Sequence, residues 1–550
     1  MDMDSSPSTQ DCGGWLLYVS LAAKCGGDPC RVVGFVAVAV VAFAVTSLLH
    51  WLSPGGPAWG RYWWNRRGGL GIAAAIPGPR GLPVLGSMSL MAGLAHRKLA
   101  AAAGGSPARR RLMALSLGET RVVVTADPGV ARELLASAAF ADRPVKESAY
   151  GMLFHRAIGF APYGTYWRAL RRVASTHLFS PRQVSASAAQ RAVIARQMVE
   201  AMRSAAAAAG GGVAARPFLK RASLHNVMWS VFGRKYELAA PESEETAELR
   251  SMVDEGYDLL GQLNWSDHLP WLAPFDLQKT RSRCSSLVPR VNRFVTRIID
   301  EHRARLSLAV DAAVDFTDVL LSLHGGDKLS DADMVAVLWE MIFRGTDTVA
   351  VLIEWVAARL VLHQDVQARV HDELDRVVGS DRAVTESDAS KLVYLQAVIK
   401  EVLRLHPPGP LLSWARLATS DVHVGGFLIP SGTTAMVNMW AITHDPAVWP
   451  DPNKFKPERF VAGPSSDQAA EFPIMGSDLR LAPFGSGRRS CPGKSLAIVT
   501  VGFWVATLLH EFDWLPLSDK SRGVDLSEVL KLSCEMATPL EARLRPRRKV

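Results

Sequence analysis

The chain has 550 residues, of which 48% are hydrophobic, and a formal net charge of +9. Its basic residues are scattered, apart from short groups such as 109–111 and 545–549, so they argue against a nucleic-acid partner and leave acidic lipid headgroups or an acidic protein. The six cysteines form no Cys-x-x-Cys pair or zinc-site spacing, and only three lie beyond residue 30, which fits a reducing compartment better than a disulfide framework.

An uncharged stretch near the N-terminus runs from Val32 to Leu49. These eighteen residues approach the length of one bilayer crossing as a helix, and they predict an uncleaved anchor. A cleaved signal peptide is the alternative, although the stretch begins late and its uncharged core is long. Arginines are more frequent after the stretch than before it, which predicts that the larger C-terminal part is cytosolic. The sequence does not decide whether two of Cys12, Cys25 and Cys30 form a disulfide.

The sequence after this stretch predicts a membrane-proximal hinge and one large domain. An aromatic cluster at 51–64 predicts an interfacial belt, and the proline-rich run 77–86 predicts a stiff connector. No internal repeat or long polar linker follows. We therefore expect a lumenal segment at 1–31, a transmembrane anchor at 32–52, an aromatic, basic and proline-rich hinge at 53–86, and a cytosolic domain at 87–550.

The first part of this domain mixes strand, helix and loop patterns. Residues 112–125 alternate and are rich in valine, which predicts a hairpin. A helix is expected at 128–135, and a loop-rich stretch with several large apolar side chains follows at 140–163. Trp167 and Arg171 are four residues apart and so share one face of a helix. By themselves they predict only a solvated basic helix.

The strongest predicted helix spans residues 330–362. Ser330 is a suitable N-cap with acidic residues in the first turn, and the helix would be about 50 Å long, enough to cross a domain. Gly345 can loosen this helix, while the hydroxyl of Thr348 and the carboxylate of Asp347 could relay protons. By itself the Gly-Thr-Asp-Thr pattern favours a capping or packing role.

A second amphipathic helix is expected at 391–405. It carries Glu401 and Arg404, which are one turn apart and would ordinarily form a surface ion pair. Arg459 lies further along the chain and could join them in a buried, charge-assisted network. Prolines then end the helix, and the alternation at 422–439 predicts a single hairpin.

The functional interpretation depends on the glycine-rich loop 483–493. Cys491 lies just before an apolar run that predicts a buried helix, so we expect it at a helix N-terminus, where the macrodipole and free N–H groups favour the metal-binding thiolate. Arg489 can pair with a carboxylate, Phe484 can shield the sulfur, and the glycines let the backbone approach a flat partner closely. A lone cysteine is otherwise most often a small buried hydrophobe.

The spacing Phe-x-x-Gly-x-Arg-x-Cys-x-Gly in this loop resembles the haem-thiolate signature of the cytochrome P450 monooxygenases. The phrases at 156–162 and 343–348 look most like family 78, subfamily A, of the plant enzymes. The resemblance implies a mainly α fold with small β-sheets, in which haem b lies between the long central helix and the loop, and Cys491 is the axial thiolate ligand of the iron. In the central-helix motif, Arg344 stands where the family usually has a small residue, and Val349 stands where it usually has a hydroxyl. The resemblance therefore does not decide which residue of this motif faces the pocket.

The resemblance also implies roles for individual residues. The haem would be held by Cys491, Arg489, Phe484, Gly487, Gly493, Trp167, Arg171 and Arg416. Oxygen activation would use Thr348 and Asp347, and the structural network would consist of Glu401, Arg404 and Arg459. The substrate pocket would be lined by Phe154, Phe160, Met341, Gly345, Leu411, Leu412 and Trp414.

The expected function is that of a single-pass endoplasmic-reticulum monooxygenase. The resemblance implies that it uses O2 and electrons from NADPH, delivered by NADPH-cytochrome P450 reductase, to hydroxylate an apolar small molecule. A fatty acid or related lipid is favoured, with a link to plant organ and seed growth. The alternatives are a reductase-independent hydroperoxide isomerase or dehydratase of the same fold, and a haem sensor without turnover.

Overall fold

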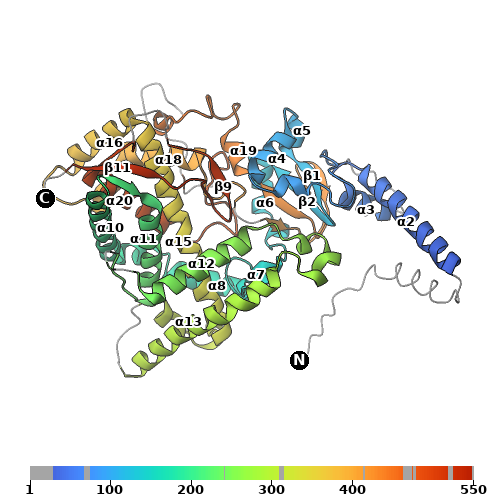
Figure 1. Ribbon diagram of the computed structural model, residues 1–550, viewed down its shortest axis with the longest axis horizontal. Coiled ribbons are helices and arrows are strands. Elements are labelled where there is room, and N and C mark those ends of the chain that lie inside the picture. The colour runs from blue at the N-terminus through green and yellow to red at the C-terminus, as the bar shows by residue number, and fades with distance from the viewer. Residues whose placement is uncertain are drawn as a thin grey trace.

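The computed structural model describes residues 29–66, 75–238, 240, 242–308, 315–412, 415–461, 474, 478–517 and 524–547. It is mainly helical with small β-sheets, as the sequence predicts. Figure 1 shows the long helix α15 (Asp331–Leu362) near the middle of the molecule. The hairpin of β1 (Met113–Leu117) and β2 (Thr120–Thr125) lies between this region and the N-terminal helices.

The central helix α15 is buried along most of its length. It begins where expected, because the side chain of Ser330 accepts a hydrogen bond from the N–H of Asp333 and caps the first turn. It packs against α11 (Ala215–Phe232), α18 (Val393–Leu405) and α20 (Lys494–Glu511). Two hydrophobic clusters divide its apolar side chains between them, so α15 joins both halves of the helical core.

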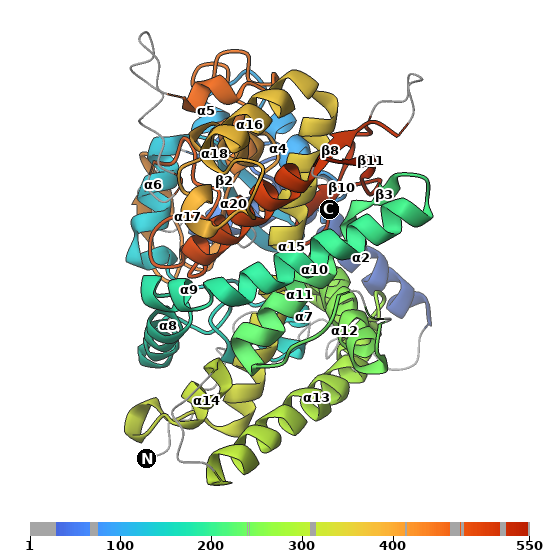
Figure 2. The ribbon, with the colours of Figure 1, turned by 90° about the vertical axis from the view of Figure 1, so that its left-hand side faces the viewer.

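The other helices surround this core, and Figure 2 shows α10 and α11 crossing in front of α15. The longer ones are α4 (Ala95–Ala103), α6 (Pro128–Ala136), α8 (Thr165–His177), α10 (Ala188–Ala208), α12 (Glu244–Gly261), α13 (Thr280–Leu308) and α16 (Gln364–Val377). The shorter ones are α5 (Pro107–Arg111), α7 (Glu147–Gly151), α9 (Pro181–Ala186), α14 (Phe316–Leu321), α17 (Glu386–Ala389) and α19 (Met439–Thr443).

The largest sheet has the strand order β1-β2-β7-β4, with β7 at Thr434–Val437 and β4 at Arg416–Leu417. Its pairs are antiparallel except β2 with β7, which run parallel. The smaller sheets pair β3 (Gly212–Ala214) and β8 (Phe512–Leu515) with β11 (Glu541–Pro546), β5 (Val422–Val424) with β6 (Phe427–Ile429), and β9 (Glu528–Leu530) with β10 (Cys534–Met536).

The predicted single hairpin at 422–439 is wrong in detail. The chain turns between β5 and β6 at Gly425 and Gly426, whose φ angles of 58° and 86° suit a tight hairpin turn. The third strand, β7, instead joins the larger sheet beside β2. Alternation fixed the strands, whereas pairing with a strand about 310 residues earlier decided where the last one went.

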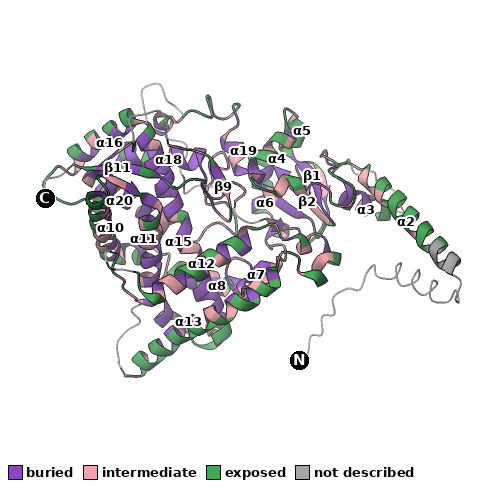
Figure 3. Ribbon diagram, in the orientation of Figure 1, coloured by how far each residue is buried: buried purple, intermediate pink, exposed green. Residues whose placement is uncertain are grey.

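The N-terminal segment forms α2 (Pro29–Trp51) and α3 (Pro57–Arg66), which Figure 1 shows extending from the side of the molecule opposite the C-terminus. Valines such as Val36, Val38 and Val40 are exposed on α2, and Figure 3 colours most of that helix as exposed. Within the described residues, no helix combines the length and apolarity needed to cross a bilayer. The structure thus confirms a helix at the expected anchor, but not a membrane-spanning one.

The hinge packs against the hairpin instead of standing free. Trp59, expected in an interfacial belt, is 1% exposed, and its Nε1 donates to the carbonyl of Leu115 at 3.1 Å. A Cβ on Gly78 would lie 1.8 Å from the carbonyl oxygen of Ala114, so the connector passes directly over β1. The expected lumenal segment up to residue 28, and hinge residues 67–74, lie outside the described residues.

The predicted network of buried charges forms between α18 and the loop that precedes residue 460. Both oxygens of Glu401 accept from Arg404 at 2.8 Å, and both side chains are fully buried. Arg459 donates to the same carboxylate at 3.4 Å. Arg404 also donates to the carbonyls of Thr443 and Pro452. The pair is therefore a buried connection between α18 and the chain that follows it, and not the surface ion pair that the spacing alone would predict.

Substituting Arg404→Ala leaves the Glu401 carboxylate buried without its bidentate partner. We expect the free energy of unfolding to fall by about 3–5 kcal/mol, measured by urea denaturation followed by circular dichroism. The control is Arg172→Gln, which breaks an exposed pair with Asp327 and should cost at most about 1 kcal/mol. Equal costs for the two substitutions would contradict a buried structural role for the network.

Candidate active site

A cavity of about 300 Å³ lies between α15 and the 483–493 loop. The central helix contributes Met341, Gly345, Thr348 and Leu352, which share the face that their spacing predicts. From the loop, the cavity is lined by Phe484, Arg489, Cys491 and Gly493, and from elsewhere by Trp167, Arg171, Leu412 and Arg416. The tertiary structure therefore brings one face of the strongest helix opposite the cysteine loop.

Cys491 lines this cavity, whereas Cys284 and Cys534 are buried in other parts of the described structure. Its N–H donates to the carbonyl of Phe484 at 2.9 Å, which closes the loop just before Gly493, the N-cap of α20. Burial raises the pKa of Cys491, while a hydrogen bond from Gly493 and the charges of Arg344 and Arg171 oppose that shift. Burial therefore opposes the thiolate at this position, and a cation bound to the sulfur would favour it.

The two glycines of the signature serve different contacts. A Cβ on Gly487 would lie 2.0 Å from the carbonyl oxygen of Leu135, and the φ of Gly487 is +70°. This glycine does not line the cavity; it lets the loop pack on α6. A Cβ on Gly493 would lie 3.1 Å from the ring of Phe179. Gly493 does line the cavity, where the absence of a side chain would leave room for a flat ligand.

Arg489 connects the cysteine loop to the loop-rich stretch 140–163. Its guanidinium donates to three main-chain carbonyls, those of Ala141, Ile158 and Ala161. It also lies 4.4 Å over the ring of Trp167. Arg171 donates to the carbonyl of Ser490 at 2.7 Å. These two arginines hold the backbone around Cys491 as well as facing the cavity.

Arg416 makes the cavity suitable for an anionic group. One terminal nitrogen, Nη1, is buried without a hydrogen-bond partner. Burial, together with the charges of Arg489 and Arg171, lowers the pKa of Arg416 to about 9. A flat ligand with two carboxylates and a metal that binds a thiolate would satisfy these cations and Cys491 together. The residues present therefore fit a haem.

Thr348 and Asp347 are neighbours in sequence but point to different surroundings. Thr348 lines the cavity, whereas Asp347 is buried and bound to Lys220 of α11 at 2.8 Å. Lys220 in turn lies 3.7 Å from Glu535 of β10. Burial raises the pKa of Asp347, and the charge of Lys220 opposes that shift. Only the hydroxyl of this pair faces the reacting space directly.

Gly345 lines the cavity, but its missing side chain also serves helix packing. A Cβ there would lie 2.4 Å from Cγ2 of Val227 on α11. The close approach of α11 to α15 therefore requires glycine at this position.

The expected substrate pocket is only partly formed by the predicted residues. Met341, Gly345 and Leu412 line the cavity, whereas Phe154, Phe160 and Leu411 do not. Phe154 instead packs on Phe343 with ring centroids 5.3 Å apart, and Leu411 joins a cluster around the first sheet. Trp414 lies outside the described residues. Further lining residues that sequence reasoning missed are Arg143, Ile158, Asn226, Val227, Ser230, Val231, Tyr257, Glu340, Arg344 and Leu532.

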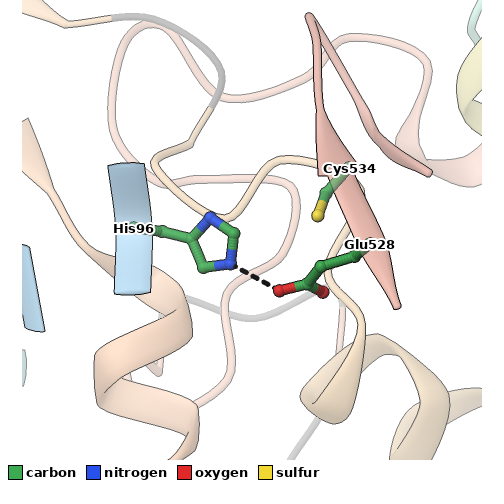
Figure 4. A group of neighbouring side chains, drawn as sticks. All are labelled: His96, Glu528 and Cys534. Carbon is green, nitrogen blue, oxygen red and sulfur yellow. Dashed lines mark hydrogen bonds and ion pairs between the residues drawn. The ribbon is translucent and has the colours of Figure 1, made fainter. Parts of the chain in front are cut away.

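A second group of potential metal ligands consists of His96, Glu528 and Cys534, none of which lines this cavity. Figure 4 shows the three side chains close to one another. Nε2 of His96 is 2.9 Å from Oε1 of Glu528, and Nε of Arg97 donates to the same oxygen. Burial would raise the pKa of Glu528, but the hydrogen bonds from His96 and Arg97 lower it to about 2. Because a guanidinium already occupies the carboxylate, we interpret the group as an ion pair that ties α4 to β9.

Comparison with known proteins decides the family. The cytochrome P450 family model matches residues 76–533. This chain belongs to the cytochrome P450 family. Cytochrome P450 78A9 of Arabidopsis thaliana is 63% identical over 93% of each chain. Cytochrome P450 78A3 of Glycine max is 60% identical, over 91% of this chain and 92% of its own. Cytochrome P450 78A11 of Oryza sativa subsp. japonica is 54% identical over 97% of each.

The predicted resemblance to plant subfamily 78A is thereby confirmed over nearly the whole chain. A cytochrome P450 is a monooxygenase that binds haem through a cysteine thiolate and receives electrons through a reductase.

Substituting Gly487→Ala in this P450 forces a Cβ into the backbone of α6. We expect a loss of about 3 kcal/mol in the free energy of unfolding, because a left-handed backbone conformation and an overlap are imposed together. Gly485→Ala is the matched control, since its φ is +68° but no atom lies within 4 Å of the added Cβ. It should cost about 1–2 kcal/mol. Urea unfolding curves of the two variants test the difference, and equal costs would contradict it.

The His96–Glu528 pair should make stability depend on pH. The pKa of Glu528 is lowered in the folded P450, so its contribution is present above its unfolded pKa and is lost as pH falls towards 2. Between about pH 6 and pH 3, wild type should lose about 1–3 kcal/mol more than Glu528→Gln. The free energy of unfolding of both proteins is measured by urea denaturation at several pH values in this range. Equal changes for wild type and Glu528→Gln would show that the carboxylate does not contribute.

Proposed function

We propose that Cys491 is the axial haem ligand of a monooxygenase that hydroxylates an apolar small molecule, with a fatty acid or related lipid favoured. The observation that carries this is that Cys491 shares one cavity with Thr348 of the central helix. The haem, when bound, supplies oxygen activation and transfer to the substrate. Electrons come from NADPH through NADPH-cytochrome P450 reductase.

The residues of this chain have separate tasks in that reaction. Arg171, Arg416 and Arg489 would hold the haem propionates, because all three line the cavity and Arg416 has a buried nitrogen without a partner. The hydroxyl of Thr348 would hold and pass on a proton at Oγ1. Asp347 would act behind it, through the chain of charges that continues to the partly exposed Lys220.

The cavity wall supports an apolar substrate. Met341, Leu352, Val231 and Leu532 contribute apolar side chains beside the proposed haem site. The same wall suits several classes of lipid, so the subfamily resemblance is what favours fatty acids. It is also the basis on which we propose a role in plant organ and seed growth.

We further propose attachment to the endoplasmic-reticulum membrane through the N-terminal segment. The exposed valines of α2 support this, because an apolar helix surface avoids water by entering a lipid layer. A second exposed apolar group at Trp271, Phe275 and Leu277 supports contact of the main domain with the same layer. The domain at 87–550 would then work on the cytosolic side.

The test is the carbon-monoxide difference spectrum of the reduced, detergent-solubilised protein. Wild type should give the thiolate-type Soret band, and Cys491→Ala should lose it while remaining folded by circular dichroism. Cys534→Ala is the matched control, since Cys534 is buried outside the cavity, and it should retain the band. A band that survives in Cys491→Ala would overturn the assignment of the ligand.

Two rival functions predict different electron use. A hydroperoxide isomerase or dehydratase would turn over without NADPH or reductase. A haem sensor would show the spectrum but no NADPH consumption that depends on substrate. The position of Thr348 on the cavity wall favours the monooxygenase, because only that reaction needs protons delivered to bound oxygen.

A further inference from the structure

Two helices approach each other closely where α12 packs on the middle of α15. A Cβ on Gly256 of α12 would lie 2.9 Å from Cε2 of Phe343 on α15, so this contact favours glycine. The next residue, Tyr257, stacks its ring on Phe343 with the ring centroids 4.4 Å apart. Tyr257 is 6% exposed, and it also lines the cavity. The contact therefore places the tyrosine of α12 against both the central helix and the cavity.

The hydroxyl of Tyr257 reaches the main chain of α15. It donates to the carbonyl of Phe343 at 2.8 Å, and this hydrogen bond is buried. In an α-helix the same carbonyl accepts from the N–H four residues later, which belongs to Asp347. The carbonyl is therefore shared between the helix and a neighbouring side chain. Burial raises the pKa of Tyr257 well above its usual range, so the hydroxyl stays protonated and remains a donor.

The turn of α15 that begins at this carbonyl is easily deformed. One residue earlier, the carbonyl of Ile342 accepts from the hydroxyl of Thr346 at 2.7 Å, and such side-chain bonds within a helix tend to bend it. Gly345 lies in the same turn, and a glycine in the interior of a helix weakens it. The turn ends at Asp347 and Thr348. The orientation of these two side chains thus depends on what holds the turn from outside.

We propose that Tyr257 is a positioning residue for proton delivery, because its hydroxyl holds the turn of α15 that carries Asp347 and Thr348. This proposal rests on the proposed function, in which Thr348 passes on a proton at Oγ1. Asp347 is bound to Lys220, whereas Thr348 lines the cavity. A turn that is fixed in place keeps the two side chains divided in this way. Tyr257 acts through the main chain of α15 and donates no proton to the reaction itself.

Loss of this hydroxyl should divert electrons rather than stop their flow. Hydroxylation consumes NADPH, a proton, O2 and one C–H bond of the substrate, and it yields the alcohol, water and NADP+. Without a correctly placed proton donor, the same NADPH, proton and O2 yield hydrogen peroxide and NADP+, and the substrate is unchanged. A small misplacement of a catalytic group is enough to slow the productive route. We therefore expect more hydrogen peroxide for each NADPH consumed.

The test variant is Tyr257→Phe, which keeps the ring on Phe343 and removes only the hydroxyl. Hydrogen exchange of the full-length, haem-loaded protein in detergent is followed by mass spectrometry without turnover. Peptides that cover residues 344–348 should exchange about twofold to tenfold faster than in wild type, because the turn loses one hydrogen bond. With dodecanoic acid as the probe substrate and purified reductase, the fraction of NADPH that ends in hydrogen peroxide should rise about threefold or more.

Tyr236→Phe is the matched control. The hydroxyl of Tyr236 donates to Glu245 of α12 at 2.6 Å, and Tyr236 does not line the cavity, so its removal should leave both measurements within about twofold. The proposal is overturned if Tyr257→Phe leaves either measurement as in wild type, or if the control changes both equally. It is also overturned if Tyr257→Phe loses the carbon-monoxide band, since the hydroxyl would then serve haem binding.

Failure of the proposed function would look different. The carbon-monoxide band, or any product that depends on NADPH, would then be missing from wild type itself. The exchange of residues 344–348 is measured without turnover, so it would still show whether Tyr257 holds this turn of α15.

Discussion

The structure depends on the burial of one long helix, α15, that remains open on a single short face. Both large hydrophobic clusters include this helix, and α11 approaches it so closely that Gly345 cannot carry a side chain. Burial on every other side makes the remaining face, around Thr348, the natural wall of a cavity. The cysteine loop forms the opposite wall, and its position is fixed by Arg489, which donates to three carbonyls of the 140–163 stretch.

The buried charged side chains of this molecule fall into two groups, those that are fully paired and those that line the cavity. The Glu401–Arg404 pair is fully enclosed and satisfied, so it fixes the relation between α18 and the loop that follows it. The arginines of the cavity are different, because Arg416 keeps a buried nitrogen without a partner and the wall has more cations than carboxylates. The satisfied pair therefore maintains the fold, whereas Arg416 offers a buried donor to a ligand in the cavity.

Sequence reasoning succeeded where the signal was local. The cap at Ser330, the hairpin at 112–125 and the residues of the cysteine loop were all predicted from short patterns. It failed for Phe154, Phe160 and Leu411, because apolar side chains in a loop can enter either a cavity or the core, and only packing decides which. Arg344 was recognised as a departure from the family pattern, but its neighbours along the chain supply no chemical reason for that departure.

The sequence by itself determined the cysteine motif that points to the family, the N-terminal end of α15 at Ser330 and the place of Cys491 just before α20, since each depends on residue types within one or two turns. Only the tertiary structure decided that Thr348 faces the cavity while Asp347 binds Lys220, because that choice depends on which neighbour packs on each side of α15. The contact between Glu340 and the loop at Gly159 was likewise set by the tertiary structure. Glu340 meets the N–H of Gly159 across 181 residues, and no local pattern specifies a contact between groups so far apart along the chain.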